Sequence, residues 1–150
     1  MKVISRRHSK RNKLRKVIVG SVWLLLFLCL AALIATPQFV MGDMINMHVD
    51  FSEVYAAEDF GLEATELSLK TLDGLNISAF EVSATKPKGV VIFISGIHNP
   101  SVTAFYGHAK LLREHGYASI LYDMRAHGKS DGDVISLGYL EILDTQAVVE

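Results

Sequence analysis

The sequence predicts an α/β domain with a partial, doubly wound and mostly parallel sheet, preceded by one transmembrane helix. Three observations support this prediction. No charged residue occurs from position 17 to position 42. Two apolar runs of strand length, at 90–94 and 118–122, flank a segment with helical spacing. The charges are also divided, because eight basic residues and no acidic one lie in the first 16 positions, whereas 16 acidic and seven basic residues follow position 42.

Residues 17–36 are predicted to be a transmembrane signal anchor. Val17–Ala35 has 19 residues, and a helix rising about 1.5 Å per residue over that length nearly covers an apolar bilayer core of about 30 Å. A cleaved signal peptide is the alternative, but cleavage after Ala35 would place Leu33 where a small residue is needed. Cys29, the single cysteine, excludes an intramolecular disulfide and is interpreted as a small apolar side chain within the span.

The basic tail, residues 1–16, is predicted to stay in the cytoplasm, with the acidic part outside the cell membrane. Its nearest partners are anionic lipid headgroups. No aromatic residue is interleaved with these charges to stack on bases, which argues against nucleic-acid binding. The basic residues are Lys2, Arg6, Arg7, Lys10, Arg11, Lys13, Arg15 and Lys16.

Residues 37–60 show no clear period and are predicted to form a stalk, with Pro37 marking the exit from the helix. The domain itself is predicted to occupy residues 61–150. Its first element is a β-hairpin, because residues 67–72 alternate apolar with polar, Asp73-Gly74 is a two-residue turn signal, and Leu75–Val82 resumes an extended pattern.

A strand–helix–strand unit should follow the hairpin. Val90–Ile94 is apolar throughout, which predicts a strand buried on both faces. Ser101–Glu114 has helical spacing, with Ser101 as a cap and Gly116 as a stop, and Ala118–Tyr122 returns to a strand parallel to the first. A second helix is predicted from the recurrence of Leu137, Leu140, Leu143 and Ala147.

These ordered motifs resemble the front half of an α/β-hydrolase of the membrane-anchored, extracytoplasmic type. Residues 122–130, Tyr-Asp-Met-Arg-Ala-His-Gly-Lys-Ser, are similar to the family signature Asp-x-Arg-Gly-His-Gly-x-Ser, with Ala126 in place of Gly. Residues 137–144, Leu-Gly-Tyr-Leu-Glu-Ile-Leu-Asp, are similar to a stretch that often follows it in anchored members. The resemblance covers residues 66–150.

The resemblance implies a serine hydrolase, in which an activated serine attacks an ester, amide or related acyl bond of a small molecule. In this fold the triad follows the order serine, acid, histidine, and the serine lies on a Gly-x-Ser-x-Gly turn after the next strand. That strand is expected just past Glu150. We therefore expect nucleophile, acid and histidine all to be absent from these residues, and the 150-residue chain alone to be inactive.

Residues 128–132 read Gly-Lys-Ser-Asp-Gly and match the nucleophile motif letter for letter. We predict that Ser130 is not the nucleophile. A nucleophile elbow needs a strand directly before the serine and a helix directly after it. Residues 123–127 separate Ser130 from the preceding strand, and no histidine follows it. We interpret Ser130 instead as a serine in a loop.

One half of an oxyanion hole is expected in the loop after Ile94, because that loop supplies one of the two backbone donors in this fold. By position the donor is the N–H of Ile97. The family usually has His-Gly where this chain has Ser95-Gly96, and His98 is interpreted as a loop residue. Arg125 and His127 should brace the loop after the second strand. No phosphate loop, dinucleotide fingerprint or metal motif occurs, so the sequence predicts no cofactor and no metal.

Two functional hypotheses remain open at this point. The first is a complete hydrolase of which the sequence is a truncated or split reading. The second, from a different class, is a non-catalytic anchored module that binds a partner through an open sheet edge.

Overall fold

The computed structural model describes the backbone of residues 2–97 and 100–150, and side chains from Arg15 onward within those ranges. Most of the basic tail's side chains and His98 therefore lie outside the described residues. The chain divides into two units, Met1–Asp43 and Met44–Glu150. In chain order its elements are α1 (Lys2–Ile45), η1 (Ala57–Phe60), β1 (Thr65–Lys70), β2 (Asn76–Val82), β3 (Val90–Ile94), η2 (Val102–Phe105), α2 (Tyr106–Glu114), β4 (Ala118–Tyr122) and α3 (Glu141–Val149).

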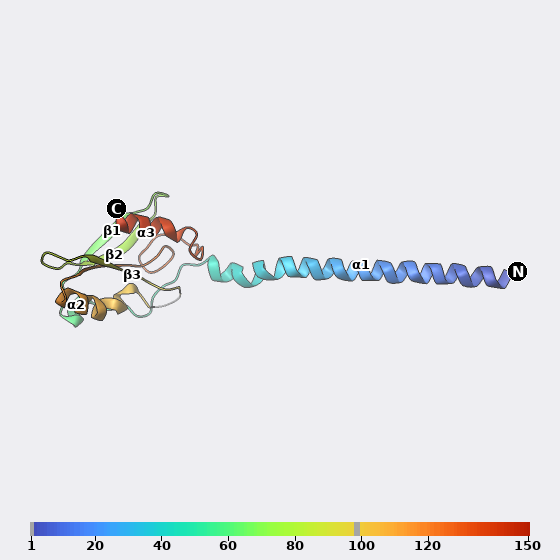
Figure 1. The fold of residues 1–150 in the computed structure, drawn as a ribbon, viewed down its shortest axis with the longest axis horizontal. Coiled ribbons are helices and arrows are strands. Elements are labelled where there is room, and N and C mark those ends of the chain that lie inside the picture. Colours follow the sequence, from blue (N-terminus) through green and yellow to red (C-terminus); the bar gives the residue numbers. More distant parts are fainter. Residues whose placement is uncertain (1, 98–99) are drawn as a thin grey trace. The chain divides into compact units, whose positions relative to one another are not determined.

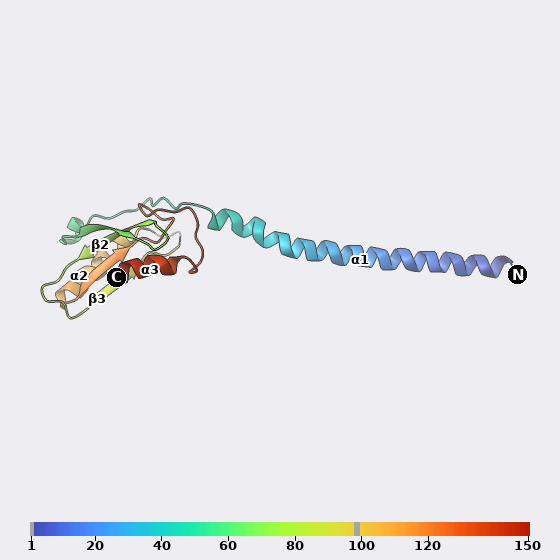
Figure 2. The same cartoon turned by 90° about the horizontal axis from the view of Figure 1, so that it is seen from above.

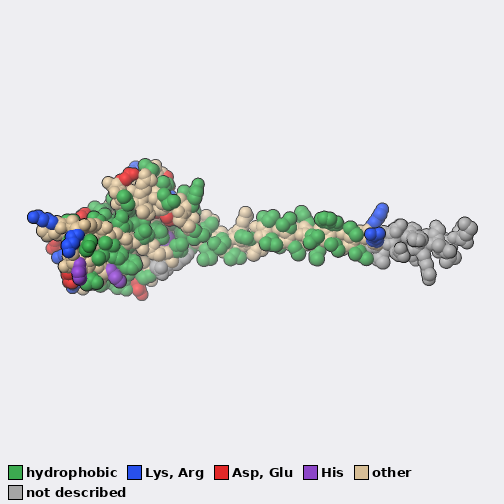
Figure 3. All heavy atoms as spheres, viewed as in Figure 1, with side chains coloured by type: hydrophobic (Ala, Val, Ile, Leu, Met, Phe, Trp, Pro, Cys, Tyr) green, Lys and Arg blue, Asp and Glu red, His purple; other side chains and the backbone are tan. Residues whose placement is uncertain are grey.

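Helix α1 is long and apolar enough to span a membrane. Its segment Arg15–Ile45 has a mean hydropathy of 2.8 over its most apolar window, and none of that window is buried. Figures 1 and 2 both show α1 as one continuous ribbon. In Figure 3 hydrophobic side chains are spread along the visible face of this helix.

The prediction that the helix ends at Pro37 is wrong, because Pro37 lies inside α1. Proline lacks the N–H that would bond to the carbonyl four residues earlier, but apolar helices tolerate this loss when nearby groups compensate. The carbonyl that loses its donor here is that of Leu33, and the Thr36 hydroxyl donates to the neighbouring Ala32 carbonyl at 2.7 Å. The helix continues eight residues beyond Pro37, to Ile45.

The four strands form one mixed sheet in the order β1-β2-β4-β3. The β1–β2 and β2–β4 pairs are antiparallel, and only β3 and β4 run parallel. The predicted strand–helix–strand unit is therefore present, but within the described residues a mostly parallel sheet is reduced to this single pair. The turn of the hairpin is longer than the two residues expected, because Thr71 and Leu75 close it around three residues that include Gly74 at φ 91°.

Helices α2 and α3 cover opposite faces of the sheet, as Figure 1 shows. The alternation of side chains along β2 explains this arrangement. Phe80 and Val82 pack with Tyr106 of α2, whereas Ile77 and Ala79 pack with Val148 of α3. Two apolar cores result, one on each face.

Strand β3 departs from the prediction of burial on both faces. Val90 is 55% exposed and Ile94 is 43% exposed. Within the described part of the chain β3 pairs with β4 alone and lies at the edge of the sheet. An apolar run predicts a buried strand only when neighbours on both sides cover it. Here the second side is open.

Residues 46–60, expected to belong to a stalk, pack against the domain instead. Val49 is buried and forms a parallel bridge with His127. Its N–H donates to the Ala126 carbonyl at 2.8 Å, and its carbonyl accepts from the Gly128 N–H at 2.9 Å. Farther along, Ala57 in η1 is buried in the core below α2. Residues 46–60 are therefore part of the folded domain.

The second helix is shorter than its periodicity predicts. Leu137 is 60% exposed, has a φ of 57° and precedes α3. The Glu141 carboxylate accepts from the backbone N–H groups of Ser136 and Gly138 at 2.7 and 2.8 Å, which holds residues 136–140 in a turn. Polar side chains of α3 face inward as well, because Asp144 is fully buried.

Candidate functional site

The loop that follows β3 begins at a buried residue that joins two strand ends. The Ser95 N–H donates to the Tyr122 carbonyl at 3.2 Å, and the Ser95 hydroxyl accepts from the Met124 N–H at 3.2 Å. Ile97, the predicted oxyanion donor, follows in a turn and is 39% exposed. The start of the loop is therefore held at the carboxyl edge of the parallel strand pair, and Ile97 lies at the surface.

Asp123 fixes the far side of the same loop. It is the first residue after β4 and only 3% exposed. Its carboxylate accepts from the Val102 N–H at 2.8 Å and from the Ser101 hydroxyl at 3.1 Å, so it caps η2. Burial raises the pKa of Asp123, while the bonds from Val102 and Ser101 oppose that rise. Sequence reasoning missed this role, although the position of Asp123 in the Asp-x-Arg motif was the available signal.

Arg125 braces the motif loop, as the sequence predicts. Its guanidinium is 3% exposed and pairs with Asp144 at 2.7 Å and with Asp73 at 2.8 Å. Burial lowers the pKa of Arg125, but its hydrogen bonds to Asp73 and Asp144 raise that pKa by more. The net effect is a pKa above the ordinary value for arginine. The same guanidinium lowers the pKa of Asp73 to about 2. Arg125 thus joins the hairpin turn to α3, and each nitrogen of its guanidinium already donates to one of these two carboxylates.

His127 and Ser130 also stabilise the loop that follows β4. His127 is completely buried, bonds through Nδ1 to the Arg125 carbonyl at 2.8 Å and stacks on Phe51. The Ser130 hydroxyl donates to the Asp123 carbonyl at 2.6 Å and accepts from the Ser78 N–H at 2.9 Å. Ser130 is 1% exposed, so its hydroxyl is held in structural hydrogen bonds. It does not lie on a strand-to-helix turn.

His48 bonds to the other end of this loop. Its Nδ1 lies 2.9 Å from the Gly132 carbonyl and its Nε2 lies 2.9 Å from the Gly128 carbonyl. Carbonyl oxygens only accept, so both bonds form together only when the ring carries two protons. The bonds to Gly132 and Gly128 raise the pKa of His48, with smaller contributions from the charges of Asp50 and Asp133, against a lowering by burial.

This geometry predicts a pH-dependent stability. A raised pKa in the folded state means that the contribution of His48 is complete below the unfolded value of about 6.5 and is lost as the pH rises through the folded value. We expect His48→Ala to destabilise the chain at pH 5.5 by less than about 1 kcal/mol, because the ring is exposed. The difference should shrink by pH 8.5. Thermal unfolding of both proteins across this range measures it, and a difference that grows with pH would contradict the two-bond geometry.

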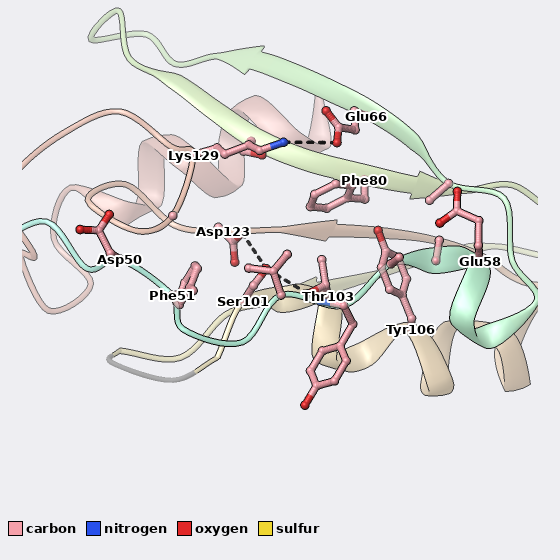
Figure 4. A pocket seen from close by; sticks show the side chains of 17 residues that line it. Asp50, Phe51, Glu58, Glu66, Phe80, Ser101, Thr103, Tyr106, Asp123 and Lys129 are labelled. Carbon is pink, nitrogen blue, oxygen red and sulfur yellow. Dashed lines mark hydrogen bonds and ion pairs between the residues drawn. The ribbon is translucent and has the colours of Figure 1, made fainter.

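A cavity of about 410 Å³ lies between residues 50–58 and the α2 face of the sheet. Figure 4 shows its lining, with Phe80 from β2, Tyr106 from α2 and Glu58 from η1. Asp123 and Ser101 also line it, so the cavity adjoins the base of the loop that follows β3. Within residues 15–97 and 100–150, no group of three His, Cys, Asp or Glu side chains could hold a metal ion.

Comparison with known proteins identifies the class of fold. No family model matches the chain. The esterase Pf2001 of Pyrococcus furiosus is 28% identical with a TM-score of 0.58, over 70% of this chain and 41% of the esterase. The polyketide transferase grgF of a Penicillium species is 32% identical over 72 residues, which are 48% of this chain and 24% of the transferase. A solved structure of GrgF, described as an α/β hydrolase, is 30% identical with a TM-score of 0.43, over 48% of this chain and 25% of that one.

The similarity to the esterase, together with the mixed sheet covered by helices, shows that the domain has an α/β-hydrolase-like fold. The chain spans less than half the length of each of these proteins, 41% of the esterase and 24% of the transferase.

Proposed function

We propose that this chain supplies the oxyanion loop and the first strands of a membrane-anchored serine hydrolase that acts on an acyl bond of a small molecule. The observation that carries the proposal is the loop after β3. Ser95 ties its start to β4, and Asp123 ties its end through Ser101. Between these two anchors the Ile97 N–H has no acceptor among the residues that the structure describes.

The chemistry follows from that position. When a serine attacks an acyl carbon, the carbonyl oxygen gains negative charge, and preorganised N–H donors stabilise it without reorganisation. One donor in this fold comes from the loop after this strand, and the other from the residue after the nucleophile. We assign the first to Ile97. The proposal gives nucleophile, acid and base to residues other than those between Met1 and Glu150.

A fluorophosphonate probe tests the assignment of the nucleophile. We expect the 150-residue chain to stay unlabelled, because the Ser130 hydroxyl is 1% exposed and already bonded to two backbone groups. Peptide mass spectrometry of the probe-treated chain measures this directly. An adduct on Ser130 that is absent from Ser130→Ala would overturn the proposal and make Ser130 the nucleophile.

The natural gene product, labelled in its own membranes, provides the second half of this test. We expect an adduct on a serine outside residues 1–150. A specific observation favours a rival, because the half-exposed edge strand β3 suits a non-catalytic module that pairs with a partner strand. A stable product that never reacts and co-purifies with one partner would favour that module.

We also propose that α1 anchors the domain on the outer side of a cell membrane. The charges support this orientation, because eight basic residues precede the apolar stretch and the first basic residue after it is Lys70. Protease treatment of intact cells should remove the domain and spare residues 1–16. Protection of the domain until the membrane is permeabilised would contradict the orientation.

A further inference from the structure

We propose that the cavity between residues 50–58 and the sheet binds a small organic cation, an ammonium ion that carries an apolar group. The proposal does not depend on the hydrolase assignment. Asp123 and Ser101 line the cavity and also hold the loop after β3, but neither is given a catalytic role. The proposal rests on the charges that line the cavity, on one unpartnered hydroxyl that opens into it and on the apolar surface around that hydroxyl.

The charges at the cavity favour a cation. Four carboxylates line it, those of Asp50, Glu58, Glu66 and Asp123, against the single ammonium of Lys129. Lys129 lies 3.4 Å from Glu66 at an exposed position and forms no ion pair with the other three carboxylates. An anion entering this space would meet like charges, whereas an ammonium ion would be attracted from several directions.

The Tyr106 side chain provides a second, independent observation. Tyr106 is 2% exposed as a whole residue, and its hydroxyl has no hydrogen-bond partner among the residues that the structure describes. The hydroxyl oxygen is not one of the fully buried atoms without a partner, so it opens into the cavity that Tyr106 lines. In Figure 4 the hydroxyl end of Tyr106 points away from α2 toward Phe80, with Glu58 on one side and Thr103 and Ser101 on the other. This hydroxyl is therefore available to a group of a ligand.

The other buried polar side chains of the cavity are already occupied. Ser101 donates to Asp123, whose second carboxylate oxygen accepts from the Val102 N–H. The Thr103 hydroxyl oxygen accepts from the Tyr55 N–H at 3.0 Å. Tyr106 is thus the buried polar group of the described lining that remains open to a ligand.

The protonation of Tyr106 is consistent with a cation acceptor. Burial raises the pKa of Tyr106 to about 12, and the charges of Glu58, Glu66 and Asp123 contribute to that rise. The hydroxyl therefore stays neutral at physiological pH. Its oxygen keeps lone pairs that can accept from an ammonium N–H.

The remaining surface selects an organic ion over a simple inorganic one. Phe51, Val54 and Phe80 line the cavity together with alanine side chains. A volume of about 410 Å³ suits a ligand of small-molecule size. Aromatic faces attract cations and also cover apolar groups. A primary ammonium ion on a short apolar group fits the negative charge, the apolar lining and the volume of this cavity.

Binding of benzylammonium, compared with benzyl alcohol of nearly the same shape, tests the proposal. The full chain is placed in nanodiscs of zwitterionic lipid, and isothermal titration is corrected with empty nanodiscs. We expect benzylammonium to bind at least about tenfold more tightly than benzyl alcohol, and the binding to weaken in high salt. Equal binding of the two probes, or none by benzylammonium, would overturn the proposal.

Three variants locate the site. We expect Glu58→Gln to weaken benzylammonium binding by about three- to tenfold, and Tyr106→Phe, which keeps the ring, by about threefold. Asp59→Asn is the matched control, because Asp59 is the exposed neighbour of Glu58 in η1 and does not line the cavity. It should leave binding unchanged. Equal weakening by Asp59→Asn, or none by Glu58→Gln, in chains with unchanged melting would contradict a site in this cavity.

Discussion

Replacement of Arg125 by Met is expected to cost about 3–5 kcal/mol of stability, because it leaves a buried carboxylate without its cation. Asp144 is fully buried, and three donors of Arg125 reach it, the backbone N–H, Nε and Nη2, at 2.7 to 2.9 Å. Thermal or chemical unfolding of the full chain in detergent measures the loss. Met retains much of the side-chain volume, so the effect reports charge and hydrogen bonds rather than a cavity.

Lys129→Met is the matched control in the same loop. Lys129 also pairs with a carboxylate, that of Glu66, but the two side chains are 72% and 69% exposed. Exposed pairs contribute about 0–1 kcal/mol, so this variant should unfold almost like the parent. Similar losses from the two variants would show that burial does not decide the strength of these pairs, contrary to our expectation.

The Arg125 cluster also sets a low-pH limit. The pKa of Asp73 is lowered to about 2 in the folded chain, below its ordinary 3.8. The contribution of Asp73 is therefore complete above about pH 4 and is lost as the pH falls toward 2. Asp73→Asn should remove this part of the acid sensitivity.

Gly128→Ala is expected to destabilise the domain by about 2–5 kcal/mol. A methyl group on Gly128 would lie 2.7 and 2.8 Å from two ring carbons of Phe51, Cε2 and Cδ2, and the backbone φ is 56°. Overpacking of this kind costs about 1–3 kcal/mol, and the left-handed conformation adds about 1–2 kcal/mol for a side-chain-bearing residue. Phe51 stacks on buried His127, so the ring could relieve the contact only by giving up this stacking.

Gly61→Ala isolates the backbone part of this cost. Gly61 has a similar φ of 68°, and the nearest atom to a new methyl group would be Lys110 Nζ at 3.9 Å. We expect it to lose only about 1 kcal/mol. Unfolding of both variants, and of Gly128→Ala combined with Phe51→Ala, separates the two contributions. If removal of the ring does not rescue Gly128→Ala, steric contact with Phe51 is not the cause.

Local sequence patterns predicted those elements whose neighbours in the fold also lie close to them in the sequence. The hairpin follows from alternation around Asp73-Gly74, and the unit from β3 to β4 follows from two apolar runs with Ser101 and Gly116 at the ends of the intervening helical segment. The role of Arg125 as a brace also followed from its motif. The polar partners Asp73 and Asp144 did not, because they lie 52 and 19 residues away in sequence.

The errors arose where a distant or missing neighbour decides the outcome. The stalk prediction failed at Val49, because Val49 pairs with His127 in an isolated β-bridge. His127 lies 78 positions later in the sequence. The burial of β3 was overestimated because an apolar run does not reveal whether both sides of a strand are paired. Leu137 fitted the helical period, but the bonds that Glu141 accepts from the Ser136 and Gly138 N–H groups hold a turn there, and the helix starts four residues later. The cavity beside Tyr106 is formed by segments that no local pattern brings together.

The bridge between Val49 and His127 has a mechanical consequence. The chain leaves α1 and reaches the sheet through residues 46–60, so any pull on α1 enters the domain along this segment. His48 and Val49 are bonded to Ala126, Gly128 and Gly132 before any strand begins. The Ile45 carbonyl, which accepts from the Ile135 N–H at 2.7 Å, comes earlier still along this path. These hydrogen bonds therefore bear the load first, and all of them are attached to the loop that follows β4. A pull on α1 would strain that loop before it reaches the strands, so the loop should be the first part of the domain to give way.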